Sequence, residues 1–184
     1  DSGTGTNVCD IEVLDDTHLI LVYTNFICYL KSFSIDSSAN NITLQDTITV
    51  DTASVYLPNV CVLDSTHVAV SYKKSNNYIK TYSLDGSYDF TYINNLVLTG
   101  SSTIGSAYID KLVDGYIVGV ANNTQTTGAA NSIFGVYSYN GSYALSEESA
   151  TNFNNKKGEF YSVSNCFVLN GNIALNLTVD GDND

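Results

Sequence analysis

The sequence predicts an all-β fold of β-propeller blades, each a sheet of four antiparallel strands, with about three and a half blades in the chain. Three observations lead to this expectation. The composition favours strands and turns, with 14 Tyr, 13 Gly, a single Pro and neither Trp nor Met in 184 residues. A motif recurs at a fixed spacing, and short polar links separate the apolar runs.

The fixed spacing is 49 residues. The segment Val13–Leu19, with the sequence VLDDTHL, returns as Val62–Val68 with the sequence VLDSTHV. The same offset relates Lys31–Asp36 to Lys80–Asp85, so one period carries two separated segments. Tandem units of this length with four strands each are typical of propellers. A two-layer β-sandwich is the alternative fold, but it does not explain the regular period.

The expected units are residues 7–50, 57–100, 106–152 and, as the first half of a fourth blade, 160–184. In the second unit the strands are expected at 59–63, 67–72, 78–84 and 90–98, joined by polar turns of hairpin length. The last copy has only two strands before Asp184. We expect further polypeptide or a neighbouring subunit to complete it, because an open sheet edge attracts another strand.

The segments LDSTH at 63–67 and YIKTYSLDGSY at 78–88 resemble a propeller-type repeat found in secreted or surface proteins of aquatic microbes and their viruses. The resemblance covers most of the chain and is best in the first two copies. The third copy lacks the Asp-x-Thr-His element, and the fourth has Asn170-Gly171-Asn172 in its place. The resemblance implies a repeat scaffold and no particular activity, since propellers serve many functions.

Charge and hydropathy limit the partners. Seven Lys and Arg stand against 19 Asp and Glu, a net charge of −12, which repels nucleic acid and anionic lipid. The longest apolar run, around Leu19–Tyr23, has the length of a strand, so we expect no membrane insertion.

His18 and His67 are the only histidines, and they occupy equivalent positions of the repeat. This equivalence favours a structural role over metal ligation or acid–base catalysis, with the preceding aspartate accepting hydrogen bonds in its turn. The sequence holds no nucleophile elbow, phosphate-binding glycine loop or zinc-protease motif. We therefore expect a protein that is not an enzyme and needs no cofactor.

Calcium is a secondary expectation near the C-terminus. Asp180, Asp182 and Asp184 alternate as in the opening of a calcium loop, although the closing acidic ligand is missing. An ordinary acidic turn explains the same residues.

In an extracellular chain, the cysteines can form disulfides and the glycosylation sequons can carry glycans. Four cysteines allow two disulfides in three pairings, with buried thiols as the equal alternative; they are Cys9, Cys28, Cys61 and Cys166. The sequons with the best positions, in expected loops or at loop edges, begin at Asn41, Asn122 and Asn140.

These features together predict a non-enzymatic structural or adhesion scaffold, extracellular or on a cell or virion surface, that is glycosylated and belongs to a longer chain or a fibrous surface assembly. Its expected partners are further copies of itself, other surface proteins or glycans. Two alternatives remain open: a lectin-like propeller that binds carbohydrate through tyrosines between the blades, and a non-catalytic part of a larger propeller enzyme.

Overall fold

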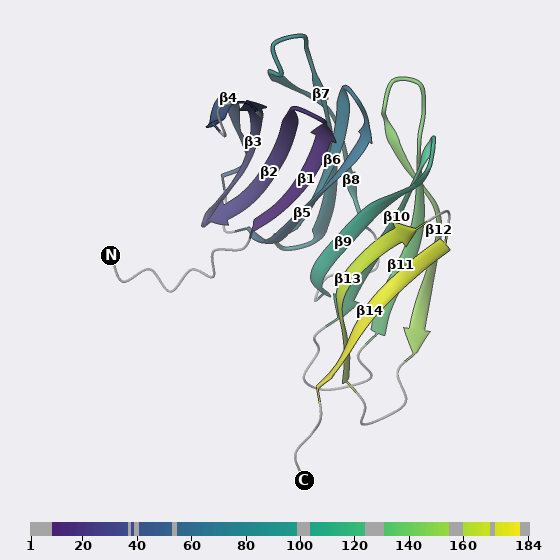
Figure 1. The fold of residues 1–184 in the computed structure, drawn as a ribbon. Coiled ribbons are helices and arrows are strands. Elements are labelled where there is room, and N and C mark those ends of the chain that lie inside the picture. Colours follow the sequence, from purple (N-terminus) through teal and green to yellow (C-terminus); the bar gives the residue numbers. More distant parts are fainter. Residues whose placement is uncertain are drawn as a thin grey trace.

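A computed structural model describes residues 9–36, 38, 41–52, 55–98, 104–123, 131–154, 160–169 and 172–180, and every regular element among them is a β-strand. The strands form four antiparallel sheets that follow one another along the chain (Figure 1). Each sheet is a meander, because each strand pairs with the next one in sequence. The all-β prediction and the repeated four-stranded units are confirmed.

Sheets A and B come from the first half of the chain. Sheet A contains β1 (Cys9–Asp15), β2 (His18–Asn25), β3 (Ile27–Asp36) and β4 (Asn41–Asp51). Sheet B contains β5 (Tyr56–Asp64), β6 (His67–Lys73), β7 (Asn77–Leu84) and β8 (Phe90–Val97). The strands of sheet B match those expected from the sequence to within a few residues.

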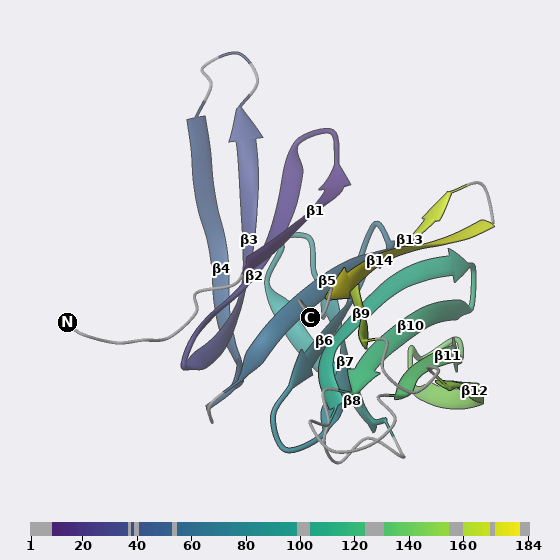
Figure 2. The same ribbon diagram turned by 90° about the horizontal axis from the view of Figure 1, so that it is seen from below.

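Sheets C and D follow. Sheet C contains β9 (Ile104–Val113), β10 (Tyr116–Asn123), β11 (Asn131–Tyr139) and β12 (Leu145–Asn154). Sheet D contains two strands, β13 (Phe160–Leu169) and β14 (Asn172–Asp180). Sheet A lies at one end of the row of sheets, and sheets C and D lie at the other (Figure 2).

The period of 49 residues is also a period of strand pairing. Tyr23 pairs with Tyr29 in sheet A, and Tyr72 pairs with Tyr78 in sheet B. In both pairs the ring centroids are 5.3 Å apart. A lysine, Lys31 in sheet A and Lys80 in sheet B, lies 5.3 Å above the first tyrosine of its pair. The repeat therefore preserves side-chain contacts as well as strands.

Sheet B is buried on both faces. One face packs against sheet A through Val60, Val68, Val70, Tyr72 and Tyr82. The other packs against sheet C through Cys61, Leu63, Ala69 and Ile79. A smaller cluster with Val118, Val120 and Val168 joins sheet C to sheet D. The core is thus divided into layers between successive sheets, which explains why β6 is apolar on both faces.

One buried side chain in sheet B lacks hydrogen-bond partners. Asn77 has 0% exposure, and neither its amide nitrogen nor its amide oxygen makes a hydrogen bond. Its equivalent in sheet A by strand pairing is the buried Cys28, a less polar residue. A buried amide without partners lowers stability because it has lost its hydration.

We expect Asn77→Val to raise the free energy of unfolding by about 1 kcal/mol, since it removes an unsatisfied polar group. Denaturant unfolding monitored by circular dichroism measures the change. Asn94→Val is the matched control and should destabilise, because Asn94 Oδ1 accepts a hydrogen bond from the Leu145 backbone. Loss of stability in Asn77→Val would show that its amide is satisfied by a bound water.

Candidate functional site

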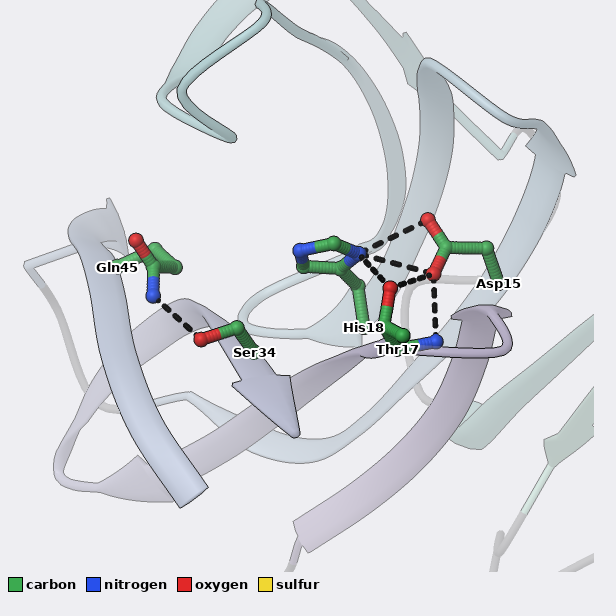
Figure 3. Close-up of polar contacts among 5 residues, drawn as sticks. All are labelled: Asp15, Thr17, His18, Ser34 and Gln45. Atoms are coloured by element: carbon green, nitrogen blue, oxygen red, sulfur yellow. Dashed lines mark hydrogen bonds and ion pairs between the residues drawn. The ribbon is translucent and has the colours of Figure 1, made fainter. Parts of the chain in front are cut away.

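The two Asp-x-Thr-His segments form identical turns. In the β1–β2 hairpin, Asp15 Oδ1 accepts hydrogen bonds from the Thr17 backbone at 2.8 Å and from the Thr17 hydroxyl at 2.9 Å, and lies 2.9 Å from His18 Nδ1 (Figure 3). In the β5–β6 hairpin, Asp64 makes the same three contacts with Thr66 and His67 at 2.8, 3.0 and 2.9 Å. The aspartate thus holds its own turn and fixes the imidazole ring.

A tyrosine from the following sheet stacks on each histidine. Tyr88 of sheet B lies on His18 of sheet A with 3.6 Å between ring centroids, and Tyr143 of sheet C lies on His67 of sheet B with 3.4 Å. We call Asp15, Thr17, His18 and Tyr88 the first histidine–tyrosine cluster. Asp64, Thr66, His67 and Tyr143 form the second. Both clusters join neighbouring sheets.

The tyrosines reach the histidines because of the turns that carry them. They end the related segments DGSY at 85–88 and NGSY at 140–143, and both have positive φ angles, 64° for Tyr88 and 56° for Tyr143. The backbone carbonyl of each accepts a hydrogen bond from the preceding sheet, from Ser32 to Tyr88 at 2.8 Å and from Thr81 to Tyr143 at 2.9 Å. These bonds from outside the turn support a conformation that is costly for a bulky residue.

The second cluster has a bond of a kind that the first lacks, between the Tyr143 hydroxyl and Asp64 Oδ2. Partial burial alone would raise the pKa of Asp64, but hydrogen bonds from Tyr143, His67 and Thr66 outweigh it and lower that pKa to about 2. The same bond to Asp64, with burial, raises the pKa of Tyr143 to about 12. The Asp64 carboxylate is therefore ionised at neutral pH, and both of its oxygens accept hydrogen bonds.

These contacts limit what the clusters can do chemically. In each cluster, the Nδ1 atom of the histidine contacts the aspartate and the threonine, and the tyrosine ring stacks on the face of the imidazole. Among the residues that the structure describes, no group of three His, Cys, Asp or Glu side chains is arranged to hold a metal ion. The geometry favours the structural role expected for His18 and His67.

The first strands of successive sheets are joined by a second recurring contact. Asp10 Oδ2 of β1 accepts a hydrogen bond from the Val60 backbone of β5 at 2.9 Å. Asn59 Oδ1 of β5 accepts one from Ile109 of β9 at 2.7 Å. Asp110 Oδ2 of β9 accepts one from Val168 of β13 at 2.6 Å. In each case, a side-chain oxygen on the first strand of one sheet accepts a hydrogen bond from the backbone of the first strand of the next sheet.

Glu12 lies among these first strands, half-buried near two carboxylates. Burial, followed by the charges of Asp10 and Asp110, raises the pKa of Glu12 to about 7. A carboxyl group whose pKa is higher in the folded than in the unfolded protein binds more protons when folded. Between about pH 4.5 and pH 7, the fold therefore loses stability through Glu12 as the pH rises.

We expect Glu12→Gln to remove this dependence. The melting temperatures of the variant and the parent chain should be close at pH 4 and should diverge up to about pH 7, with the variant higher above that pH. Thermal unfolding across the pH range measures the difference. Parallel curves for the two chains would contradict the raised pKa.

An open groove of about 570 Å³ lies at the junction of sheets A and B. Sheet A contributes residues 48–50 of β4, and sheet B contributes Lys80, Tyr82, Phe90, Tyr92 and Asn95. Tyr92 is 55% exposed and meets Tyr82 edge to face, with 5.9 Å between centroids. The Lys80 ammonium donates to the Val50 carbonyl oxygen at 2.6 Å, and burial lowers the pKa of Lys80. The groove thus offers an exposed aromatic ring beside an amide side chain.

The cysteines are distributed over different parts of the fold. Cys28 and Cys61 are free, buried thiols in the two separate core layers, and Cys9 is a free, exposed thiol. Cys166 lies in β13, and its side chain is outside the described part of the chain. Cys28 and Cys61 therefore match the buried-thiol alternative, and the disulfide pairing stays a prediction.

The remaining candidate residues lie near strand ends. Asn41 is exposed at the start of β4, and Asn140 is exposed just after β11, where its side chain accepts hydrogen bonds from Ser142 and Ala144. Asn122 is the penultimate residue of β10. Asp180 ends β14, and the other two aspartates of the expected calcium loop, 182 and 184, fall outside the described residues.

The sequence pattern missed the stacking role of Tyr88 and Tyr143. The signal was visible, since DGSY and NGSY recur at matching places in two units.

A scan against models of protein families and a search of curated proteins found no match. In the described part of the chain, no helix is long and apolar enough to cross a membrane.

Proposed function

We propose that this chain is a non-enzymatic structural scaffold in which β-propeller blades form part of an extracellular or surface assembly. The observation that carries the proposal is the repetition of the histidine–tyrosine cluster at two successive sheet junctions. The polar side chains most suited to chemistry, His18, His67 and their aspartates, are engaged in holding sheets together. A repeated joint of this kind supports an architectural role.

The blade arrangement has its own support. Four-stranded meanders pack face to face in chain order, and their first strands are joined by the side chains of Asp10, Asn59 and Asp110. In a propeller the first strand of each blade lies beside the axis, next to its counterparts. We propose that β1, β5, β9 and β13 take this position.

The proposed setting is extracellular or on a cell or virion surface, with glycans at Asn41, Asn122 and Asn140. The exposure of Asn41 and Asn140 supports glycan attachment there. The net charge of −12 favours proteins and glycans over nucleic acid as partners. The scaffold requires neither a cofactor nor calcium.

Mass spectrometry of the native protein, before and after enzymatic deglycosylation, tests the setting. We expect a mass above the 19.9 kDa of the polypeptide in the untreated sample, and glycopeptides at the three sequons. Glycan-free peptides at all three sites in native material would contradict the glycosylated scaffold.

Carbohydrate binding is the second candidate function, and the groove at the junction of sheets A and B favours it. Aromatic faces pack against the apolar faces of sugars, and Asn95 offers both a donor and an acceptor beside Tyr92. Thermal unfolding with a panel of neutral saccharides tests this function. A rise in melting temperature that is lost in Tyr92→Ala would favour the lectin over the scaffold, and an unchanged temperature throughout would favour the scaffold.

A further inference from the structure

Sheet A has one face that no described residue covers, and this face is largely apolar. Its strands place the face's side chains in cross-strand rows, because Val13 pairs with Leu19 and Leu19 with Phe33, while Ile11 pairs with Leu21. We call it the outer face of sheet A. Lys31, Thr47 and Thr49 are its polar members, and its other members are Cys9, Ile11, Val13, Leu19, Leu21, Tyr23, Tyr29, Phe33, Ile35, Ile42 and Leu44.

Several of these side chains are strongly exposed. The exposed fractions are 56% for Ile11, 69% for Val13, 64% for Ile42 and 49% for Leu44. A contiguous apolar patch that spans all four strands of a sheet is unusual on a monomeric protein and indicates a contact surface.

The repeat identifies what this surface is built to contact. Advancing the face residues of β1, β2 and β3 by 49 positions converts the outer face of sheet A into the face of sheet B that packs on sheet A. On the fourth strand, pairing relates Ile42 to Phe90 and Leu44 to Tyr92. Ile11 corresponds to Val60, which is 1% exposed, and Leu21 corresponds to Val70, which is 0% exposed. Tyr23 corresponds to Tyr72, which is 1% exposed, and Phe33 corresponds to Tyr82, which is 2% exposed.

The lysine of this surface is also shared by the two sheets. Lys80 lies over Tyr72 and donates to the Val50 carbonyl oxygen of sheet A, 2.6 Å away. Lys31 lies over Tyr23 at the same 5.3 Å. Lys31 is thus placed to donate to the backbone of a sheet that packs on the outer face of sheet A.

We propose that the outer face of sheet A binds a second copy of this chain, through the sheet D end of that copy. This inference rests on the proposed scaffold function and names its partner. Sheet B presents one face to the next sheet, C, and the opposite face to the previous one, A. The outer face of sheet A is equivalent to the face of sheet B that contacts the previous sheet, so the surface that fits it is the opposite face of another sheet. In a second copy, sheet D supplies this surface. The contact is heterologous, and repetition produces a ring or a filament.

The junction between copies lacks one stabilising feature of the junctions within the chain. Sheet B carries Tyr88 in DGSY, but the corresponding segment of sheet A reads Asp36-Ser37-Ser38-Ala39. No tyrosine is available there to stack on a residue of the partner. The contact between copies is therefore weaker than the internal junctions, and assembly depends on protein concentration.

Sedimentation velocity of the chain over a range of concentrations tests the proposal. We expect species larger than a monomer whose fraction grows with concentration. Val13→Glu should weaken assembly at least about tenfold, because it places a charge in an apolar contact. Val113→Glu is the matched control, since Val113 is 51% exposed on β9 outside this face, and it should assemble like the parent. Ile11→Glu provides a second variant on the face.

Mixing separates a head-to-tail contact from pairing of two outer faces. The Val13→Glu copy keeps its sheet D end, so in small amounts it should add to parent assemblies and shorten them. A parent chain that stays monomeric at all concentrations, or a Val13→Glu chain that assembles normally, would overturn the proposal. Failure to shorten the assemblies would overturn the head-to-tail arrangement. Neither result depends on saccharides, whose stabilising effect tests the scaffold function separately.

Discussion

Gly135→Ala is expected to lower the free energy of unfolding by about 2–3 kcal/mol, because the added methyl group has no space. Gly135 of β11 pairs with Gly119 of β10, and the ring of Tyr137 lies over both glycines. A Cβ at position 135 would lie 2.6 Å from Tyr137 Cζ, and one at position 119 would lie 3.0 Å from its Cε2. An aromatic ring over a cross-strand glycine pair shields backbone that would otherwise be uncovered.

The ring cannot move away without disturbing the core. Tyr137 is 2% exposed and packs in the layer between sheets B and C with Ile109 and Ile117. Displacing it therefore opens the junction between two sheets as well as straining β11. Denaturant unfolding, with the slope checked for constancy, measures the loss.

Gly141→Ala is the control for Gly135→Ala. An added Cβ at position 141 meets no atom within 4 Å, and the residue does not have a positive φ. This variant should match or slightly exceed the stability of the parent, because alanine restricts the unfolded chain. Equal stability of Gly135→Ala and Gly141→Ala would show that Tyr137 does not pack over Gly135.

Asp64→Ala is expected to cost about 2–3 kcal/mol, since it removes the hydrogen bonds that hold the β5–β6 turn and the one that joins this turn to sheet C. Asp64 binds the Thr66 backbone and hydroxyl, contacts His67 and accepts from the Tyr143 hydroxyl. Asp15→Ala is the matched variant in sheet A and should cost less, about 1 kcal/mol, because the first cluster lacks the bond from a tyrosine hydroxyl.

Acid titration provides an independent check on Asp64. Its pKa of about 2 in the folded protein is below the ordinary value of 3.8, so its stabilising effect is present above about pH 4 and is lost as the pH falls toward 2. The parent chain should lose stability over this range more steeply than Asp64→Ala. Equal acid sensitivity of the two chains would contradict the hydrogen-bonded carboxylate.

The strands were predictable because the signals for them are local. The β1–β2 and β5–β6 turns each contain a hydrogen-bonding aspartate, so Asp64-Ser65-Thr66 indicates the end of one strand and the start of the next. The period of 49 then transfers this assignment from one unit to another. The structural role expected for His18 and His67 followed from the same equivalence.

Contacts between sheets were not predictable in this way. Tyr88 contacts His18 across 70 positions of sequence, and the left-handed backbone of a tyrosine is not encoded by its residue type. The raised pKa of Glu12 comes from burial, then from Asp10 and last from Asp110, which belongs to a different sheet. The groove beside Tyr92 exists only because β4 and β8 meet at a junction. Such features depend on which side chains meet across a junction, and the period of the sequence does not by itself identify those pairs.

The layered core determines the order in which the sheets unfold locally. Within the part of the chain that the structure describes, sheet A has one packed junction, whereas sheet B has two. In an array where each unit contacts only its neighbours, separating a terminal unit breaks one interface and separating an internal unit breaks two. Amide hydrogens should therefore exchange with solvent in a graded order, and those of β6, buried on both faces in sheet B, should be among the slowest.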